Sequence, residues 1–175
     1  SVLCQTYEDV ELVVIVDGDA TLCEMVTADF GEDDQVVIHC NQENRGLSFG
    51  RNKGVELASG EVVAFIDDDA VADERWVEEL VGGYDRHAAS AVGGQMAPRW
   101  VAGKPAHVPE EFYFLFGVTY RGFPTEETAV RNTFSSNLSF RRDVFTELGG
   151  FSEQMGKRGG NELQGGETEL CARLY

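Results

Sequence analysis

The chain has 175 residues, of which 42% are hydrophobic and 10% aromatic, a composition that indicates a folded globular protein and excludes a disordered one. Its 31 acidic and 14 basic residues give a formal net charge of -17, which disfavours binding to nucleic acid or to anionic lipid. The length predicts one domain over residues 1–175, and no apolar run reaches the ~18 residues that a membrane-spanning helix needs.

Short apolar runs alternate with helical patterns along the first hundred residues. Residues 10–18 are rich in β-branched side chains and predict a buried strand, and residues 21–30 predict the helix that follows it. Repetition of this alternation predicts an α/β fold with a doubly wound, mostly parallel sheet flanked by helices. The other elements predicted here are a strand at 35–40, a helix at 46–60, a strand at 61–67, a helix at 73–87 with Asp73 as its N-cap, and a strand at 90–97.

The second half of the chain is less regular. Residues 100–130 are rich in Pro, Gly and aromatic side chains, and they predict irregular structure or a short helix packed over the sheet. Residues 135–151 predict a strand and then a helix that ends at glycine. Residues 165–175 have helical spacing after a glycine-rich loop.

The cysteines and the charged residues bear on the cellular environment. The chain has no CxxC pair, and the apolar surroundings of Cys23 and Cys40 predict reduced, buried thiols in a cytosolic protein. His39, His87 and His107 share no metal-ligand spacing with the cysteines. Many acidic residues with few lysines are typical of proteins from salt-loving organisms, although an acidic protein from another source fits the same composition.

Three adjacent aspartates, Asp67 to Asp69, follow directly after a predicted strand in "EVVAFIDDDA". Ligands of doubly wound sheets bind beyond the carboxyl ends of the strands, and "VDGD" at residues 16–19 occupies a similar position. Mg²⁺ and Mn²⁺ prefer oxygen ligands, usually one or two carboxylates together with water and substrate phosphates. Taken alone, the triplet therefore predicts either a divalent-cation site or an acidic turn exposed to solvent.

Four stretches in order resemble the landmarks of the family 2 glycosyltransferases with the GT-A fold. They are "SVLCQTYEDVELVVIVDGDA", "NRGLSFGRNKGVELASGEVVAFIDDDA", "SSNLSFRRDVFTELGGFSE" and "GGETELCARL". The resemblance implies an inverting, metal-dependent enzyme that moves a sugar from a UDP- or GDP-sugar donor to a hydroxyl group of a glycan or lipid-linked acceptor. It also implies Mg²⁺ or Mn²⁺ as cofactor, and a location in the cytoplasm or at the cytoplasmic face of the membrane.

The same resemblance implies roles for individual residues. Asp17 and Arg51 are expected at the nucleotide base, and Asn52 is expected to support the loop beside it. The other expected positions are Asp67 at the ribose, Asp69 on the metal, Asp68 in either role or in solvent, Asn137 and Arg141 beside the sugar and acceptor, and Arg142 on the surface.

The general base is expected in "GGETEL", where this chain departs from the family pattern GEDxDL. Gly166 stands where the first acid usually lies, and Glu167 stands in place of the aspartate that removes the proton. A glutamate can perform the same proton transfer with one more methylene of reach. Glu167 is therefore the expected base, and Glu169 is the alternative.

Two further departures leave other interpretations open. The family's opening strand is absent, which predicts unpaired strand edges, and the chain stops just after the candidate base, so it is either a fragment or begins from a misplaced start. A degenerate nucleotide-binding module without turnover is the main alternative function. A sugar nucleotidyltransferase would need a glycine-rich, basic phosphate loop near the amino terminus, and the sequence has none.

Overall fold

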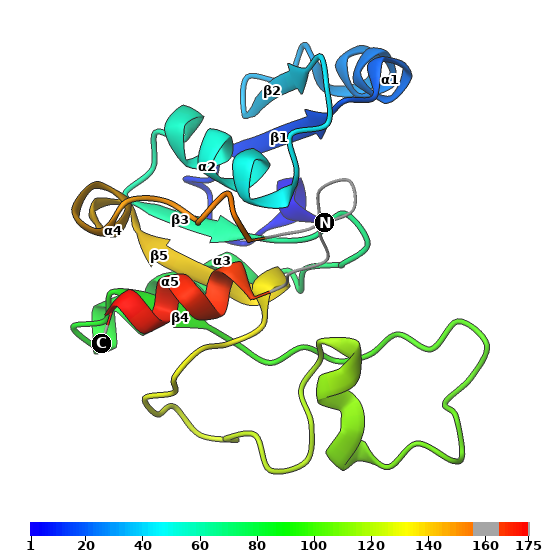
Figure 1. Cartoon of the computed structure of the whole chain (residues 1–175), viewed down its shortest axis with the longest axis vertical. Helices are drawn as coiled ribbons and strands as arrows, with labels where there is room; N and C mark the ends of the chain where they lie inside the picture. The colour runs from blue at the N-terminus through cyan, green and yellow to red at the C-terminus, as the bar shows by residue number, and fades with distance from the viewer. Residues whose placement is uncertain (156–164, 175) are drawn as a thin grey trace.

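The computed structural model describes residues 1–155 and 165–174, and it contains two β-sheets with helices packed around them (Figure 1). The first sheet pairs β1 (Leu12–Asp17) with β2 (Val36–Asn41) in parallel, and α1 (Ala20–Phe30) connects them. This is the βαβ unit that the sequence predicts. The register runs from Leu12 beside Val36 to Asp17 beside Asn41, so two polar side chains meet at the carboxyl ends of both strands.

The second sheet has the order β3-β5-β4. Its strands are β3 (Val62–Phe65), β4 (Ala91–Gly93) and β5 (Leu138–Arg141), and β5 is antiparallel to both neighbours. The beginning of β5 therefore lies beside the ends of β3 and β4. Within the described residues, β1, β2, β3 and β4 each lack a strand partner along one edge, and β5 is paired on both sides.

The remaining helices mostly follow the sequence prediction. The strand predicted at 90–97 is shorter in the structure, where β4 ends at Gly93, and a Cβ atom at Gly93 would overlap Thr133 and Asn137. The helices are η1 (Val2–Cys4), α2 (Leu47–Leu57), α3 (Trp76–Arg86), η2 (Glu110–Phe116), η3 (Ser135–Asn137), α4 (Arg142–Leu148) and α5 (Gly166–Leu174), where η denotes a 3-10 helix.

Residues 100–130 combine irregular structure with the short helix η2, as predicted. They do not cover the sheet, however, and Figure 1 shows η2 (green) standing apart from both sheets. Within residues 1–155 and 165–174, no helix combines the length and the apolar character that crossing a bilayer would require.

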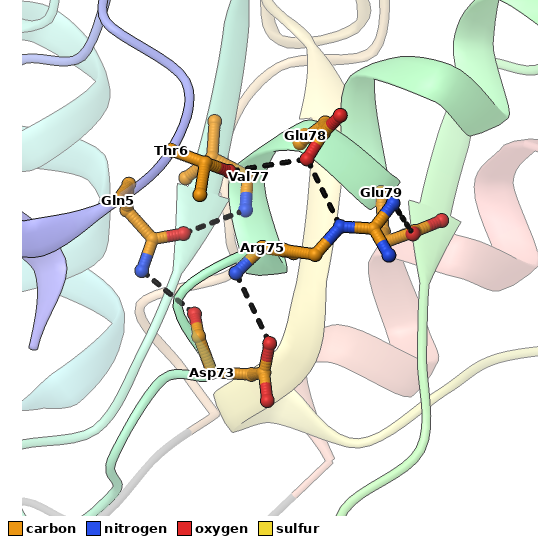
Figure 2. Close-up of polar contacts among 7 residues, drawn as sticks. All are labelled: Gln5, Thr6, Asp73, Arg75, Val77, Glu78 and Glu79. Carbon is orange, nitrogen blue, oxygen red and sulfur yellow. Dashed lines mark hydrogen bonds and ion pairs between the residues drawn. The ribbon is translucent and has the colours of Figure 1, made fainter.

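The start of α3 differs from the prediction, and Figure 2 shows why. The helix begins at Trp76, and Asp73 forms the preceding turn by accepting a hydrogen bond from the Arg75 N–H (3.0 Å). The amide of Gln5 accepts from the Val77 N–H (2.9 Å) and donates to the Asp73 carbonyl (2.8 Å). Gln5 thus satisfies a first-turn N–H group that lacks a partner inside the helix, and it links the amino-terminal segment to α3.

An aromatic core joins the second sheet to α4 and α5. Phe140 and Leu170 are fully buried, and the ring of Phe151 lies 5.2 Å from that of Phe65 at the end of β3. The core also contains Leu138, Val144 and Cys171, with Phe145, Leu148 and Leu174 packed against it. The core thus lies directly beneath the segment where β3 passes into the aspartate triplet.

The prediction of reduced thiols is wrong for two of the four cysteines. Cys23 in α1 and Cys40 in β2 form a disulfide, with their Cα atoms 6.0 Å apart. The spacing of these cysteines along the sequence does not predict the disulfide, because the packing of α1 beside β2 is what brings them together. Cys171 is buried and free, as expected, whereas Cys4 is free and exposed. The predicted cytosolic location no longer has the cysteines as support.

We expect reduction of the disulfide, or the substitution Cys23→Ser, to lower the free energy of unfolding by about 3 kcal/mol, because the bridge closes a loop across a sequence separation of 17. Urea unfolding with and without dithiothreitol measures the difference. Cys4→Ser removes an exposed free thiol and serves as the control. Equal stability of the oxidised and reduced chain would contradict the expectation.

Candidate functional site

Asp17 organises the loop between β2 and α2. Its carboxylate accepts hydrogen bonds from the Asn41 amide (2.8 Å), from the Arg45 N–H (2.9 Å) and from the Gly46 N–H (2.7 Å). The next residue, Gly18, has φ +83, and a Cβ atom there would collide with the backbone nitrogen of Asn44. The "VDG" sequence therefore closes a tight turn against residues 41–46, and Asp17 fixes the start of α2.

The ionised form of Asp17 is favoured in the folded chain. Burial is the largest single influence and opposes ionisation, but the hydrogen bonds from Arg45, Asn41 and Gly46 outweigh it and lower the pKa of Asp17 below its usual value of 3.8. The carboxylate is therefore an anchored negative charge at the carboxyl end of β1.

Arg51 brings two carboxylates together. Its guanidinium lies 3.5 Å from the Asp67 carboxylate and 3.7 Å from the Glu167 carboxylate, and only 9% of its side chain is exposed. It also lies over the rings of Phe65 and Phe151, at 5.9 and 5.5 Å from their centroids. Residues from α2, from the end of β3 and from the first turn of α5 thus converge around one cation.

Asn52 fastens the same helix to the chain before α5. Its amide donates to the Phe151 carbonyl (2.9 Å) and accepts from the Phe151 N–H (2.7 Å). A Cβ atom at Gly150 would overlap the Asn52 side chain, which explains a glycine at this position. Asn52 thus holds residues 150–151, and its expected support of the loop beside the base stays a prediction.

The three aspartates of the triplet are not equivalent. Asp67 is held by Arg51 and by a hydrogen bond from the Ser136 hydroxyl. Asp68 and Asp69 form the exposed turn that follows, and neither carboxylate has a hydrogen bond or ion pair to any other described residue. Residues 1–155 and 165–174 hold no group of three His, Cys, Asp or Glu side chains arranged to bind a metal ion.

The two candidate bases have different surroundings. Glu167 lies in the first turn of α5 and faces Arg51, with 23% of its side chain exposed. Glu169 is held in an ion pair with Arg173 (2.8 Å) on the same helix. Glu167 is therefore the carboxylate that belongs to the Arg51 cluster.

The Cys171 thiol lies close to Glu167. Burial and the negative charge of Glu167 raise the pKa of Cys171 to about 11, so this thiol stays protonated.

Asn137 is a buried junction between several segments. Its amide accepts from the Trp76 indole (2.9 Å) and donates to the Gln95 carbonyl (2.9 Å). Its backbone carbonyl accepts from the Thr133 hydroxyl (3.0 Å). The expected contact of Asn137 with the sugar or acceptor stays a prediction, and in this structure its amide is engaged by protein groups.

The structure does not bring Arg141 to the cluster. Arg141 pairs with Val62 at the beginning of β3, whereas Asp67 follows the end of that strand, which puts Arg141 about 15 Å away along the strand direction. Arg141 donates to the Ala89 carbonyl and lies 5.0 Å from the Tyr84 ring. Arg142 is exposed, as expected, and it donates to the Ala58 carbonyl after α2.

Sequence reasoning missed Ser136 and Asn41. Ser136 is the hydroxyl that holds Asp67, and Asn41 is the amide that holds Asp17. Asn41 could have been found, because it follows the second predicted strand just as Asp17 ends the first. Ser136 could not be found in this way, because its position depends on the antiparallel direction of β5.

A cavity of about 710 Å³ lies apart from this cluster, between α3, β4 and residues 127–133. Asn137 is the predicted site residue that lines it. The cluster of Arg51, Asp67 and Glu167 lies outside this cavity, at the edge where β3 ends.

The chain belongs to glycosyl transferase family 2, whose sequence profile matches residues 1–149. Among curated relatives, it is 52% identical over 176 residues to a glucosyl-dolichyl phosphate glucuronosyltransferase from Haloferax volcanii, covering all of this chain and 56% of that protein. A second relative, glycosyltransferase GlyA from Streptococcus pneumoniae, is 38% identical over 46% of this chain and 12% of its own length. The chain thus spans about half, or less, of the length of these relatives.

Solved structures show the same fold. The mannosyltransferase PcManGT from Pyrobaculum calidifontis, in complex with GDP-Man and Mn²⁺, aligns with a TM-score of 0.67 and 19% identity over 95% of this chain and 44% of that one. TarS from S. aureus in complex with UDP aligns with a TM-score of 0.67 and 16% identity over 96% of this chain and 47% of that one. The predicted GT-A class is confirmed.

The anchoring of Asp17 predicts a pH-dependent loss in Asp17→Asn. Because the folded pKa lies below the unfolded one, the stabilisation is complete above about pH 4 and disappears as the pH falls through the lower, folded value. At neutral pH we expect a loss of about 1 kcal/mol in urea unfolding, allowing for solvent screening.

The difference between the wild type and Asp17→Asn should shrink below about pH 4, whereas the exposed Asp68→Asn control should match the wild type throughout. A difference that stays constant with pH would contradict the role of the ionised carboxylate.

Proposed function

We propose that the chain forms the donor-binding and catalytic part of an inverting, metal-dependent glycosyltransferase. The observation that carries this proposal is the convergence of Arg51, Asp67 and Glu167 at the end of β3, from three segments far apart in the sequence. An enzyme that aligns a donor and a proton acceptor needs such a cluster at the carboxyl edge of its sheet.

The donor would bind along the edge from β1 to β3. Asp17 and the turn it organises would form the wall of the base pocket, with Arg51 near the base. Asp67, oriented by Arg51 and Ser136, would hold the ribose hydroxyl groups. Support for this arrangement comes from the hydrogen bonds that already fix both aspartates.

The residues at the triplet fit a divalent cation. The Asp69 carboxylate is exposed and makes no hydrogen bond or ion pair with any described residue, so its oxygen atoms can bind a metal ion. Mg²⁺ or Mn²⁺ needs only one or two protein carboxylates when a diphosphate and water complete the shell, so the lack of a three-residue cluster is compatible with it. When bound there, the cation would neutralise the charge that develops on the departing diphosphate.

Glu167 would act as general base. In this step the acceptor hydroxyl oxygen forms a bond to the anomeric carbon, the Glu167 carboxylate takes the hydroxyl proton, and the bond from that carbon to the diphosphate oxygen breaks on the opposite face. Arg51 would orient the Glu167 carboxylate and the neighbouring Asp67 at the same time. Attack from the face opposite the leaving group inverts the anomeric centre.

The relatives suggest which substrates to test first. The name of the Haloferax volcanii relative describes transfer of a glucuronosyl group to glucosyl-dolichyl phosphate. We therefore propose a nucleotide-linked uronic acid as donor and a sugar linked to a polyisoprenoid phosphate as acceptor, with UDP preferred for the first assays over GDP. Such an acceptor would place the reaction at a membrane surface, and we propose the cytoplasmic face that the family resemblance implies.

We expect calorimetry to detect UDP binding that requires Mn²⁺ or Mg²⁺ and that weakens on the order of 10-fold to 100-fold in Asp69→Asn, because a charged ligand to the cation is lost. Asp68→Asn is the matched control and should bind like the wild type. A larger effect of Asp68→Asn would transfer the metal role to Asp68. Binding that ignores both the metal and Asp69→Asn would contradict the metal site.

Glu167→Gln should keep the affinity for UDP and lower the transfer rate about 10²-fold to 10⁴-fold, the usual contribution of a general base. Sugar transfer to a glucosylated polyisoprenoid phosphate, followed with a radiolabelled donor, measures this loss. Glu169→Gln breaks the Arg173 ion pair and should affect stability more than rate. Turnover unchanged in Glu167→Gln would move the base elsewhere, and a wild-type chain that binds UDP without hydrolysis or transfer would favour the degenerate nucleotide-binding module.

A further inference from the structure

One segment departs from the charge and the packing of the rest of the chain. This segment, residues 95–134, which we call the aromatic segment, connects β4 to η3 and carries equal numbers of acidic and basic residues in a chain of net charge -17. The charged residues are Arg99, Lys104, Arg121, Arg131, Glu110, Glu111, Glu126 and Glu127. Its aromatic residues are Trp100, Phe112, Tyr113, Phe114, Phe116, Tyr120, Phe123 and Phe134.

The helix η2 within this segment turns most of its large apolar side chains outward. Phe112 and Phe114 are each 50% exposed, Phe116 is 51% exposed and Leu115 is 67% exposed. Tyr113 is buried, with its ring 5.6 Å from that of Trp100. The rings of Phe116 and Phe114 pack on one side against Trp100 and Tyr120, at 5.8 Å each, so Phe112 and Leu115 are the side chains of η2 without such a contact outside the helix. Soluble surfaces seldom expose so many large apolar side chains in succession, and such patches usually mark a site of interaction.

Polar contacts at the base of η2 hold it in this orientation. Glu110 pairs with Lys104 (2.7 Å) and with Arg121 (3.2 Å), and Arg121 also pairs with Glu111 (3.2 Å). The Arg121 N–H donates to the Glu110 carbonyl (3.1 Å). These ion pairs neutralise the two acids nearest to the phenylalanines, so the outward face of η2 presents apolar groups without an unpaired negative charge.

Both ends of the aromatic segment meet at the candidate active site. The Gln95 carbonyl and the Thr133 hydroxyl bond to Asn137, and the preceding residue, Ser136, holds Asp67. Figure 1 shows η2 and the loops on either side of it projecting away from both sheets, whereas residues 127–133 return to α3 and β4. A surface that binds η2 would therefore lie on the side of the molecule that carries the cluster of Asp67 and Glu167.

We propose that η2 binds the surface of a lipid bilayer, with Phe112, Phe114, Leu115 and Phe116 entering the interfacial region. This inference rests on the proposed function, in which the acceptor is anchored in a membrane by a polyisoprenoid chain. Phe and Leu side chains are typical of the face that an interfacial helix buries at the boundary between lipid headgroups and acyl chains. The rest of the acidic chain is repelled by an anionic surface, which leaves this neutral, apolar segment as the part that can approach lipid.

The charge distribution gives this contact a distinctive signature. Because the protein is strongly negative and binds through an apolar contact, its affinity for zwitterionic vesicles should be higher than its affinity for anionic vesicles. Salt should strengthen binding to the anionic vesicles, because it screens the repulsion between them and the chain. Binding through basic residues would show the opposite dependence on both lipid charge and salt.

The test is flotation of the full chain, without nucleotide, on vesicles of dioleoylphosphatidylcholine, alone or with one part in five of dioleoylphosphatidylglycerol. The double variant Phe112→Ser/Leu115→Ser should lower the fraction bound to zwitterionic vesicles at least roughly 10-fold, because two exposed apolar side chains are lost. Met25→Ser is the matched control, since Met25 is 59% exposed on α1, where Glu24 and Asp29 lie nearby, and it should float like the wild type.

Three results would overturn the proposal. They are a wild-type chain that does not float, an equal loss in Met25→Ser, and binding that requires the anionic lipid. Sedimentation equilibrium adds a fourth, because a dimer that dissociates in Phe112→Ser/Leu115→Ser would assign η2 to a second copy of the chain. UDP calorimetry on the same variant should match the wild type, so failure to float is distinguished from failure of the glycosyltransferase site.

Discussion

One guanidinium group, that of Arg51, unites the candidate site. Asp67 and Glu167 would repel each other if they were brought together alone, and the chain already carries a net charge of -17. The arginine lies between them, is almost fully enclosed, and covers the rings of Phe65 and Phe151. The site can therefore form only when α2, the end of β3 and α5 have packed together, so its electrostatics and the aromatic core depend on each other.

The neighbouring residue makes this dependence stricter. Asn52 bonds both the N–H and the carbonyl of Phe151, whose ring belongs to the core beneath the aspartate triplet. One turn of α2 thus contributes the cation of the site and the clamp that positions the chain before α5. Within this helix, Arg51 supplies the positive charge of the site and Asn52 positions the chain at Phe151. A substitution of either residue would therefore also alter the surroundings of the other.

The fold class, the βαβ unit and most helices could be predicted, because their hydrophobic periodicity is local. The triplet stands out because three aspartates end a predicted strand, whereas Glu167 is indicated only by the resemblance of "GGETEL" to the family pattern. Arg141 was expected beside the donor because it follows "SSNLSF", but an antiparallel strand brings its first residues to the site and carries its last ones away. The Cys23–Cys40 disulfide likewise depends on packing between elements, which spacing along the chain does not reveal.

The hydrogen bonds from Gln5 to the start of α3 differ from those of Asp17 in their response to acid. An amide side chain does not titrate, so its hydrogen bonds to Val77 and Asp73 keep their strength at every pH. The loop held by Asp17 depends instead on an ionised carboxylate. On acidification the turn after β1 should therefore loosen before the Gln5 hydrogen bonds at the start of α3 are affected.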